Sequence, residues 1–149
     1  MTEEKELNRI FVVEDDVDIQ FIIEMALVEF GGFEVVICPD GNTLFNKLEN
    51  SQPDLILLDV MLPDDDGPTI ITKLKKDPAY ADIPVIFATA RVRGKDVQSY
   101  MDLGAIGVLS KPYEIEELCD QIRDMFHQFL ILSVQSLADG KMRQYLNTN

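Results

Sequence analysis

Leu55-Ile56-Leu57-Leu58-Asp59 is the stretch that decides the fold, because four consecutive apolar residues lead directly into an aspartate. A half-exposed strand alternates apolar and polar residues, whereas a strand buried on both faces is apolar throughout. The run therefore predicts a central strand of a parallel sheet with helices on both sides. The turn from Leu62 to Gly67 ends it, and we interpret Asp64, Asp65 and Asp66 as turn and helix-capping carboxylates.

The alternation of strand and helix extends in both directions from this run. Short apolar runs predict four further strands, at residues 10–13, 33–37, 83–88 and 106–109. Apolar residues at helical spacing follow each strand, and the last set is Ile115, Leu118, Cys119, Ile122, Met125, Phe126 and Phe129. Parallel neighbours need a helix between them. The sequence thus predicts an α/β fold with a doubly wound, five-stranded parallel sheet in one domain.

Capping and turn residues mark the ends of these elements. Asp16 fits the role of N-cap for the first helix, and the second begins near Asp40. Gly31-Gly32 can provide the left-handed stop of the first helix, and Gly104 ends the fourth. Pro84 falls near the start of the fourth predicted strand, where a missing backbone donor costs least.

The composition is that of an ordinary folded domain. Of 149 residues, 46% are apolar and 27% are charged. Lys and Arg total 13 against 27 Asp and Glu, and the formal charge of -14 disfavours direct binding to nucleic acid or anionic lipid. Residues 1–9 hold no apolar signal core, and no apolar run is long enough to cross a bilayer. We therefore expect a cytoplasmic protein without membrane insertion.

The cysteines and the single histidine suggest no metal or redox site. Cys38 and Cys119 have neither a zinc spacing nor a C-x-x-C spacing, and we expect them to be reduced core residues. His127 is the only histidine, which excludes a histidine-rich metal site and leaves no ready general base beside a Ser or Cys nucleophile.

Charged and hydroxyl residues instead follow four of the predicted strands. Glu14-Asp15 ends the first strand, Asp59 the third, Thr89 the fourth and Lys111 the fifth. In an open α/β sheet, sites form at the carboxyl ends of the strands, so these side chains should meet at one edge. Two carboxylates about 4 Å apart repel by roughly 4 kcal/mol at an effective dielectric near 20. A divalent cation offsets that repulsion, and hard oxygen ligands with room for water suit Mg²⁺.

Four motifs together resemble those of response-regulator receiver domains, over about residues 8–130: Val12-Val13-Glu14-Asp15-Asp16, Leu57-Leu58-Asp59-Val60-Met61-Leu62-Pro63, Ala88-Thr89-Ala90 and Ser110-Lys111-Pro112. The resemblance implies a flavodoxin-like strand order, 2-1-3-4-5. It implies that Asp59 accepts a phosphoryl group from a sensor histidine kinase or a histidine phosphotransfer protein. Asp15 and Asp59, the main-chain carbonyl of Met61, and Glu14 acting through water would hold the Mg²⁺.

The same resemblance assigns roles to Thr89 and Lys111. Thr89 would hydrogen-bond a phosphoryl oxygen, while Lys111 would pair first with the Asp59 carboxylate and then with the phosphoryl group. Their movement would signal through the face formed by helix four, strand five and helix five to a downstream protein target. Lys111-Pro112 resembles the cis-proline junction of the family.

Val108 departs from the family pattern, which has Tyr or Phe three positions before the lysine. Without that ring, either loop movement alone transmits the signal or another side chain, Tyr113 or Tyr100, substitutes for it. Met61 and Arg91 occupy positions that influence phosphate lifetime in the family. Arg91, Arg93 and Lys95 form a basic cluster, interpreted as a solvated loop.

Residues 131–149 lie beyond the resemblance and comprise a C-terminal extension of helix five and a polar tail. Their apolar residues suggest three alternatives: lengthening helix five, docking on the domain, or pairing with a second copy as a homodimer. The chain is either a stand-alone receiver or the N-terminal piece of a larger regulator.

Three functional alternatives remain beside the phosphoacceptor. One is an unphosphorylated receiver-like docking module, suggested by Val108. The second is a flavodoxin-like FMN binder, although Glu14-Asp15-Asp16 would repel the flavin phosphate. The third and weakest is an aspartyl-phosphate phosphatase, because this chain has no second Asp two residues after Asp59.

Overall fold

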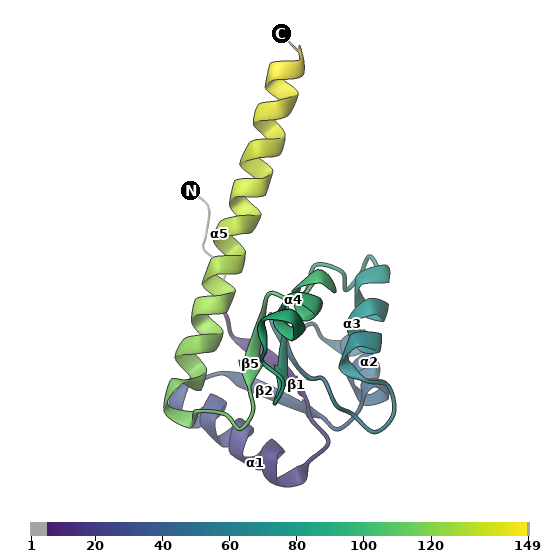
Figure 1. Ribbon diagram of the computed structural model, residues 1–149, viewed down its shortest axis with the longest axis vertical. Coiled ribbons are helices and arrows are strands. Elements are labelled where there is room, and N and C mark those ends of the chain that lie inside the picture. Colours follow the sequence, from purple (N-terminus) through teal and green to yellow (C-terminus); the bar gives the residue numbers. More distant parts are fainter. Residues whose placement is uncertain (1–5, 149) are drawn as a thin grey trace.

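A computed structural model describes residues 6–148, which form five parallel strands alternating with helices (Figure 1). The strands are β1 (Arg9–Val13), β2 (Glu34–Cys38), β3 (Leu55–Asp59), β4 (Val85–Thr89) and β5 (Gly107–Ser110). The helices are α1 (Val17–Met25), η1 (Ala26–Phe30), α2 (Gly41–Asn50), α3 (Gly67–Lys76), α4 (Gly94–Asp102) and α5 (Ile115–Thr148). The strand order is β2-β1-β3-β4-β5, so the predicted α/β class and topology are confirmed.

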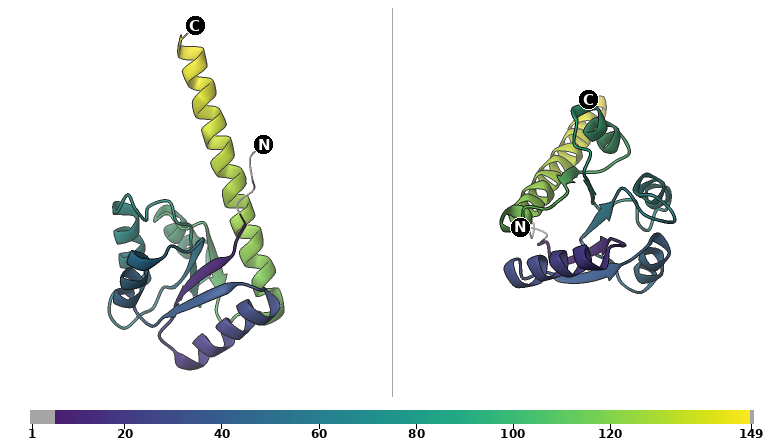
Figure 2. Two further views of the ribbon diagram at one scale, coloured as in Figure 1. Left: turned by 180° about the vertical axis from the view of Figure 1, so that it is seen from behind. Right: turned by 60° about the horizontal axis from the view of Figure 1, so that its bottom comes forward.

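Helices cover the sheet on both faces (Figure 2). Successive strand residues point to opposite faces, so Phe11 and Val13 lie in one core while Ile10 and Val12 lie in the other. The helices α2, α3 and α4 complete the first core, and α1, η1 and α5 complete the second. All five residues of β3 are buried. Each buried Leu or Ile contributes about 1.5–3 kcal/mol, which fixes the strand that ends in Asp59.

The register aligns the carboxyl ends of four strands. Val13 at the end of β1 lies beside Leu58 of β3, and Asp59 lies beside Ala88 of β4. Thr89 in turn lies beside Ser110, the last residue of β5. The residues that follow these strand ends therefore meet at one edge of the sheet.

Aspartates begin three of the helices, as the sequence predicts. Asp16 accepts hydrogen bonds from the backbone N–H groups of Asp18 (2.9 Å) and Ile19 (3.1 Å), which satisfies two donors at the start of α1. Asp40 and Asp66 cap α2 and α3 in the same way. Two predicted stops are also confirmed, since Gly32 has φ +69° and Gly104 has φ +107°, values that favour glycine.

Several predicted boundaries shift. The first helix changes to the π-helix η1 at Ala26, whose carbonyl accepts a hydrogen bond from the Cys119 thiol of α5 (3.5 Å). Strand β2 begins one residue later than predicted. Pro84 precedes β4 instead of lying inside it, because proline has no N–H for the ladder. The helix α5 continues through Gly140 to Thr148, which corresponds to the first of the three alternatives for this segment, a longer helix five.

Candidate functional site

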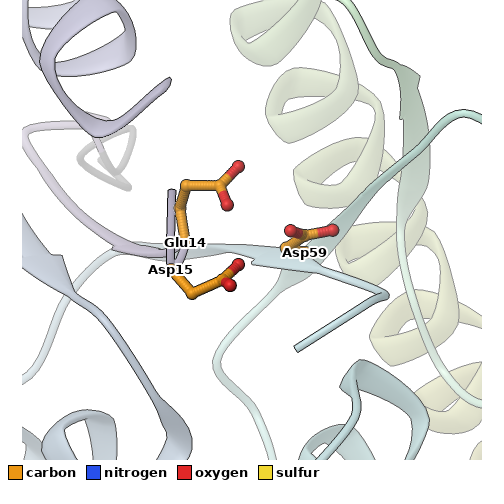
Figure 3. A group of neighbouring side chains, drawn as sticks. All are labelled: Glu14, Asp15 and Asp59. Atoms are coloured by element: carbon orange, nitrogen blue, oxygen red, sulfur yellow. The ribbon is translucent and has the colours of Figure 1, made fainter. Parts of the chain in front are cut away.

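Three carboxylates lie together where β1 and β3 end (Figure 3). Glu14, Asp15 and Asp59 each offer an oxygen atom, and these atoms lie within 4.8 Å of one another. Glu14 is 2% exposed and Asp59 is 6% exposed, whereas Asp15 is open to solvent. The site is therefore reached from the Asp15 side and closed behind Glu14.

Lys111 forms ion pairs with both buried carboxylates. Its Nζ lies 2.6 Å from Oε1 of Glu14 and 3.1 Å from Oδ2 of Asp59. Burial by itself lowers the pKa of Lys111, but the hydrogen bonds to Glu14 and Asp59 together with the negative charges of these two groups outweigh burial and hold the pKa above its ordinary value. One lysine against three carboxylates leaves an excess of two negative charges, which matches a divalent cation. The acidic cluster is thus consistent with the Mg²⁺ site of a receiver domain.

The oxygens of Glu14 are already engaged by protein groups. Oε1 accepts from Lys111, and Oε2 accepts from the backbone N–H of Asp16 at 3.2 Å. The Glu14 carbonyl also accepts from Nε2 of Gln20 at 2.6 Å. Sequence reasoning missed Gln20, which lies one turn into α1 and faces the site. Both carboxylate oxygens of Glu14 thus accept from protein donors, whereas the Asp15 carboxylate is exposed to solvent; how each would bind a metal stays a prediction.

Asp59 is held at both carboxylate oxygens. Oδ1 accepts from the backbone N–H of Met61 at 3.2 Å, and Oδ2 accepts from Lys111. The Met61 side chain points outward and is 72% exposed. Met61 therefore contributes its backbone to the site, and its carbonyl as a metal ligand stays a prediction.

Gly67 supports Asp59 from behind, and sequence reasoning missed this role. A Cβ atom on Gly67 would lie 2.8 Å from the Asp59 carbonyl oxygen and 2.9 Å from Cε1 of Phe87. Only glycine allows α3 to begin so close to the end of β3. A signal for this role is Asp66-Gly67-Pro68, where a glycine separates a cap from a helix-starting proline.

Thr89 and Lys111 are linked through the backbone at the ends of β4 and β5. The Lys111 N–H donates to the Thr89 carbonyl at 2.9 Å. The Thr89 hydroxyl is buried and accepts from the Arg91 N–H at 3.0 Å, which connects it to the loop before α4. The Lys111-Pro112 bond is cis, as the resemblance implied.

The two tyrosines considered as substitutes for an aromatic at position 108 lie on opposite faces of the sheet. Tyr100 of α4 packs against Phe87 with ring centroids 5.2 Å apart, in the same core that Val108 contacts. Tyr113 packs in the other core, and burial, followed by the charges of Glu14 and Asp59, raises its pKa. Tyr100 is thus the tyrosine that shares a core with Val108.

Other residues singled out in the sequence are not members of the acidic cluster. Arg91, Arg93 and Lys95 are exposed and line an open hollow of about 560 Å³ at the start of α4. Cys38 and Cys119 are free, buried thiols, as expected. No helix within residues 6–148 is both long and apolar enough to span a bilayer.

Comparisons with known proteins agree with the geometry. Residues 10–123 match the response regulator receiver domain family. The chain is 36% identical over 122 residues to the DNA-binding dual master transcriptional regulator RpaA of Synechocystis sp., covering 82% of this chain and 50% of that protein. It is 34% identical over 132 residues to the phosphate regulon transcriptional regulatory protein PhoB of Escherichia coli, covering 89% of this chain and 57% of that protein.

Solved structures show the same fold. A putative response regulator from Chloroflexus aurantiacus superposes with a TM-score of 0.74 at 24% identity, over 82% of this chain and 99% of that one. The chemotaxis response regulator CheY4 of Vibrio cholerae gives a TM-score of 0.74 at 23% identity, over 80% and 99%. The chain spans about half the length of the curated relatives RpaA and PhoB. With the motifs, the strand order and the acidic cluster in agreement, the chain belongs to the response regulator receiver domains of two-component systems.

Proposed function

We propose that this receiver accepts a phosphoryl group on Asp59 from the phosphohistidine of a sensor histidine kinase or a histidine phosphotransfer protein. One observation carries the proposal: a nearly buried aspartate ends the central strand, with Lys111 on one oxygen and two further carboxylates within 4.8 Å. A receiver domain is a signalling phosphoacceptor rather than a classical enzyme, and it implies a cognate histidine kinase.

In the proposed transfer, a carboxylate oxygen of Asp59 attacks the phosphorus of the donor. The new O–P bond forms as the N–P bond breaks, and the electron pair of that bond returns to the imidazole nitrogen. The Met61 N–H holds Oδ1 of Asp59 and so fixes the direction of the carboxylate. Lys111 shifts from the carboxylate to the phosphoryl oxygens, where negative charge gathers.

The residues present fit a bound Mg²⁺, the cofactor that we propose. Asp15 and Asp59 would provide carboxylate ligands, the Met61 carbonyl a third oxygen, and Glu14 would act through water because its oxygens are engaged. When bound, the ion would screen the anionic phosphoryl group from the anionic carboxylate.

The donor would approach over α1, which begins two residues after Asp15. Val17, Phe21 and Met25 recur every four residues on one face of α1 and are 73%, 68% and 42% exposed. A mainly apolar cavity of about 390 Å³ lies beside that helix, between Ile19 and Ile22 of α1 and Lys111 to Tyr113 after β5. A protein donor can bury apolar side chains there while its phosphohistidine reaches Asp59.

The phosphorylation signal would reach a downstream protein target through the face formed by α4, β5 and α5. Movement of Thr89 toward a phosphoryl group would break or stretch its hydrogen bond from Arg91 and move the loop that leads into α4. The Thr89 backbone is bonded to Lys111, so β5 would follow. Tyr100 connects α4 to Phe87 of β4 in place of a ring at position 108.

The proposal includes a cytoplasmic location, which fits the two free thiols. RpaA is described as DNA-binding and PhoB as a transcriptional regulatory protein. Those activities belong to whole proteins of which this chain matches only about half, and the charge of -14 favours a protein partner here over direct nucleic-acid contact.

Intact-mass analysis after incubation with acetyl phosphate tests the proposal. We expect a Mg²⁺-dependent gain of about 80 Da, one phosphoryl group, in the wild type and in the control Asp64→Asn, whose carboxylate is exposed in the same loop. The gain should vanish in Asp59→Asn. A gain that persists in Asp59→Asn would move the acceptor elsewhere. If the wild type gains no mass and does not bind beryllofluoride, the chain is a docking module that is not phosphorylated.

A further inference from the structure

The distal half of α5 exposes apolar side chains far from the phosphoacceptor site. The helix has 34 residues and runs well past the rest of the domain (Figure 1). Its core contacts come from residues up to about Leu130. Beyond that point, seven large apolar side chains are between 47% and 68% exposed: Ile131, Leu132, Val134, Leu137, Met142, Tyr145 and Leu146.

Five residues of this segment form a stripe whose spacing is symmetric about Ala138. Ile131 and Tyr145 lie seven positions before and after Ala138, and Val134 and Met142 lie four positions before and after it. At about 100° per residue, all five fall within roughly 80° of the helix circumference. The same rotation places the stripe nearly opposite the core-facing residues Leu118, Ile122 and Phe126, so it faces away from the sheet.

We propose that this stripe binds the same stripe of a second copy in an antiparallel helix pair, with Ala138 on the two-fold axis. Antiparallel pairing about Ala138 places Ile131 opposite Tyr145 and Val134 opposite Met142, so each large side chain meets one from the partner. An isologous interface requires such self-complementarity. The small side chain of Ala138 allows the two helices to approach where they cross.

Charge favours a second copy as the occupant. The chain carries -14 overall, yet residues 130–149 contain one acid, Asp139, and two bases, Lys141 and Arg143, a net charge of +1. Two copies can therefore bring their extensions together without strong repulsion. Antiparallel pairing also holds the two acidic domains about 16 residues apart along the helix, roughly 24 Å or three Debye lengths at physiological salt.

The surface area that the paired helices would bury sets the expected stability of the dimer. The paired stripes are about 21 Å long and would remove on the order of 1,000 Å² from water, the lower limit for a specific interface. We therefore expect a reversible dimer that forms at about micromolar to high-micromolar concentration. The proposal is independent of phosphorylation, since the stripe is remote from Asp59.

Sedimentation velocity of the full chain from about 5 to about 500 µM tests the pairing. We expect a monomer–dimer equilibrium whose dissociation constant rises more than about tenfold in Ala138→Arg, because two like charges would face each other on the axis. Ser136→Arg makes the same change at an exposed position on the other side of the helix and should leave the equilibrium unchanged. Both variants should still gain a phosphoryl group from acetyl phosphate.

Disulfide trapping tests the orientation. A mixture of Val134→Cys and Met142→Cys chains should cross-link under mild oxidation, whereas either variant alone should not. Cys38 and Cys119 are buried and present in every variant, so the wild type measures any cross-linking that does not come from the added cysteines. Equal cross-linking of Val134→Cys alone would show parallel pairing and overturn the register. A wild type that stays monomeric at every concentration, or that binds anionic vesicles as a monomer, would overturn the second copy as the occupant.

Discussion

Replacing Lys111 with Met should destabilise the domain strongly in the absence of Mg²⁺. The lysine is the cation that contacts both Glu14 and Asp59, whose side chains are 2% and 7% exposed. Removing one partner of a buried ion pair costs about 3–5 kcal/mol, and the partial exposure of Lys111, 17%, places our expectation near the lower bound, about 3 kcal/mol. At roughly 2–4 °C per kcal/mol for a chain of this length, Tm should fall by about 6–12 °C.

Lys73 provides a matched control for Lys111. Its Nζ lies 2.6 Å from Asp65, the same distance as the Lys111–Glu14 contact, but the two side chains are 54% and 44% exposed. Lys73→Met should therefore cost at most about 1 kcal/mol. Urea unfolding at neutral pH with EDTA measures both variants. Similar losses in the two variants would refute the argument that burial makes the Lys111 contacts strong.

The stability lost in Lys111→Met should also depend on Mg²⁺ and on pH. Mg²⁺ should stabilise Lys111→Met more than the wild type, because the variant has more uncompensated negative charge, and Glu14→Gln should restore part of the loss. The pKa of Lys111 is raised above its ordinary value of 10.5 in the folded state. The lysine's stabilisation is thus complete below that ordinary pKa and is lost as pH rises through the raised one.

Three further predictions concern other parts of the domain. Gly67→Ala should lower the free energy of unfolding in urea by about 1–3 kcal/mol and slow phosphorylation by acetyl phosphate, because the added Cβ would press on the Asp59 carbonyl. The control Gly94→Ala places its Cβ in open space and should cost little. Hydrogen bonds from Thr69 hold the pKa of Asp66 below its ordinary value of 3.8. The stabilisation of the fold by Asp66 is therefore present above pH 3.8 and is lost as pH falls through the lower native pKa. Asp66→Asn should reduce the loss of stability in acid, as measured by circular dichroism. Phe21→Ala should slow transfer from a phosphohistidine protein by about tenfold and leave acetyl phosphate labelling unchanged, and a fall in both rates would reject the donor surface on α1.

The fold could be predicted because its signals are local. Residues 55–58 are apolar without alternation because helices cover both faces of β3, so the burial of this strand can be predicted from its own residues. The caps at Asp16 and Asp40 and the stops at Gly32 and Gly104 follow from short-range chemistry. The change from α1 to η1 could not be predicted, because it occurs where α5 contacts Ala26 from 93 positions away.

The site was predictable as a set of residues but not as a set of contacts. Strand ends bring Glu14, Asp59 and Lys111 to one edge in any sheet of this order. Which carboxylate Lys111 approaches more closely depends on side-chain geometry, and the structure gives Glu14 the shorter contact. The role of Gly67 depends on the close approach of α3 to β3, which no pattern within one segment encodes.

The short Lys111–Glu14 contact changes how the resting site should be understood. If Lys111 paired only with Asp59, phosphorylation would have to break its sole ion pair. Because Glu14 holds Nζ at 2.6 Å and Asp59 holds it at 3.1 Å, the lysine can turn from Asp59 to a phosphoryl oxygen while keeping its Glu14 contact. Glu14→Gln should then weaken the hold on Lys111 and slow transfer even with Mg²⁺ saturating, which separates this positioning role from metal binding.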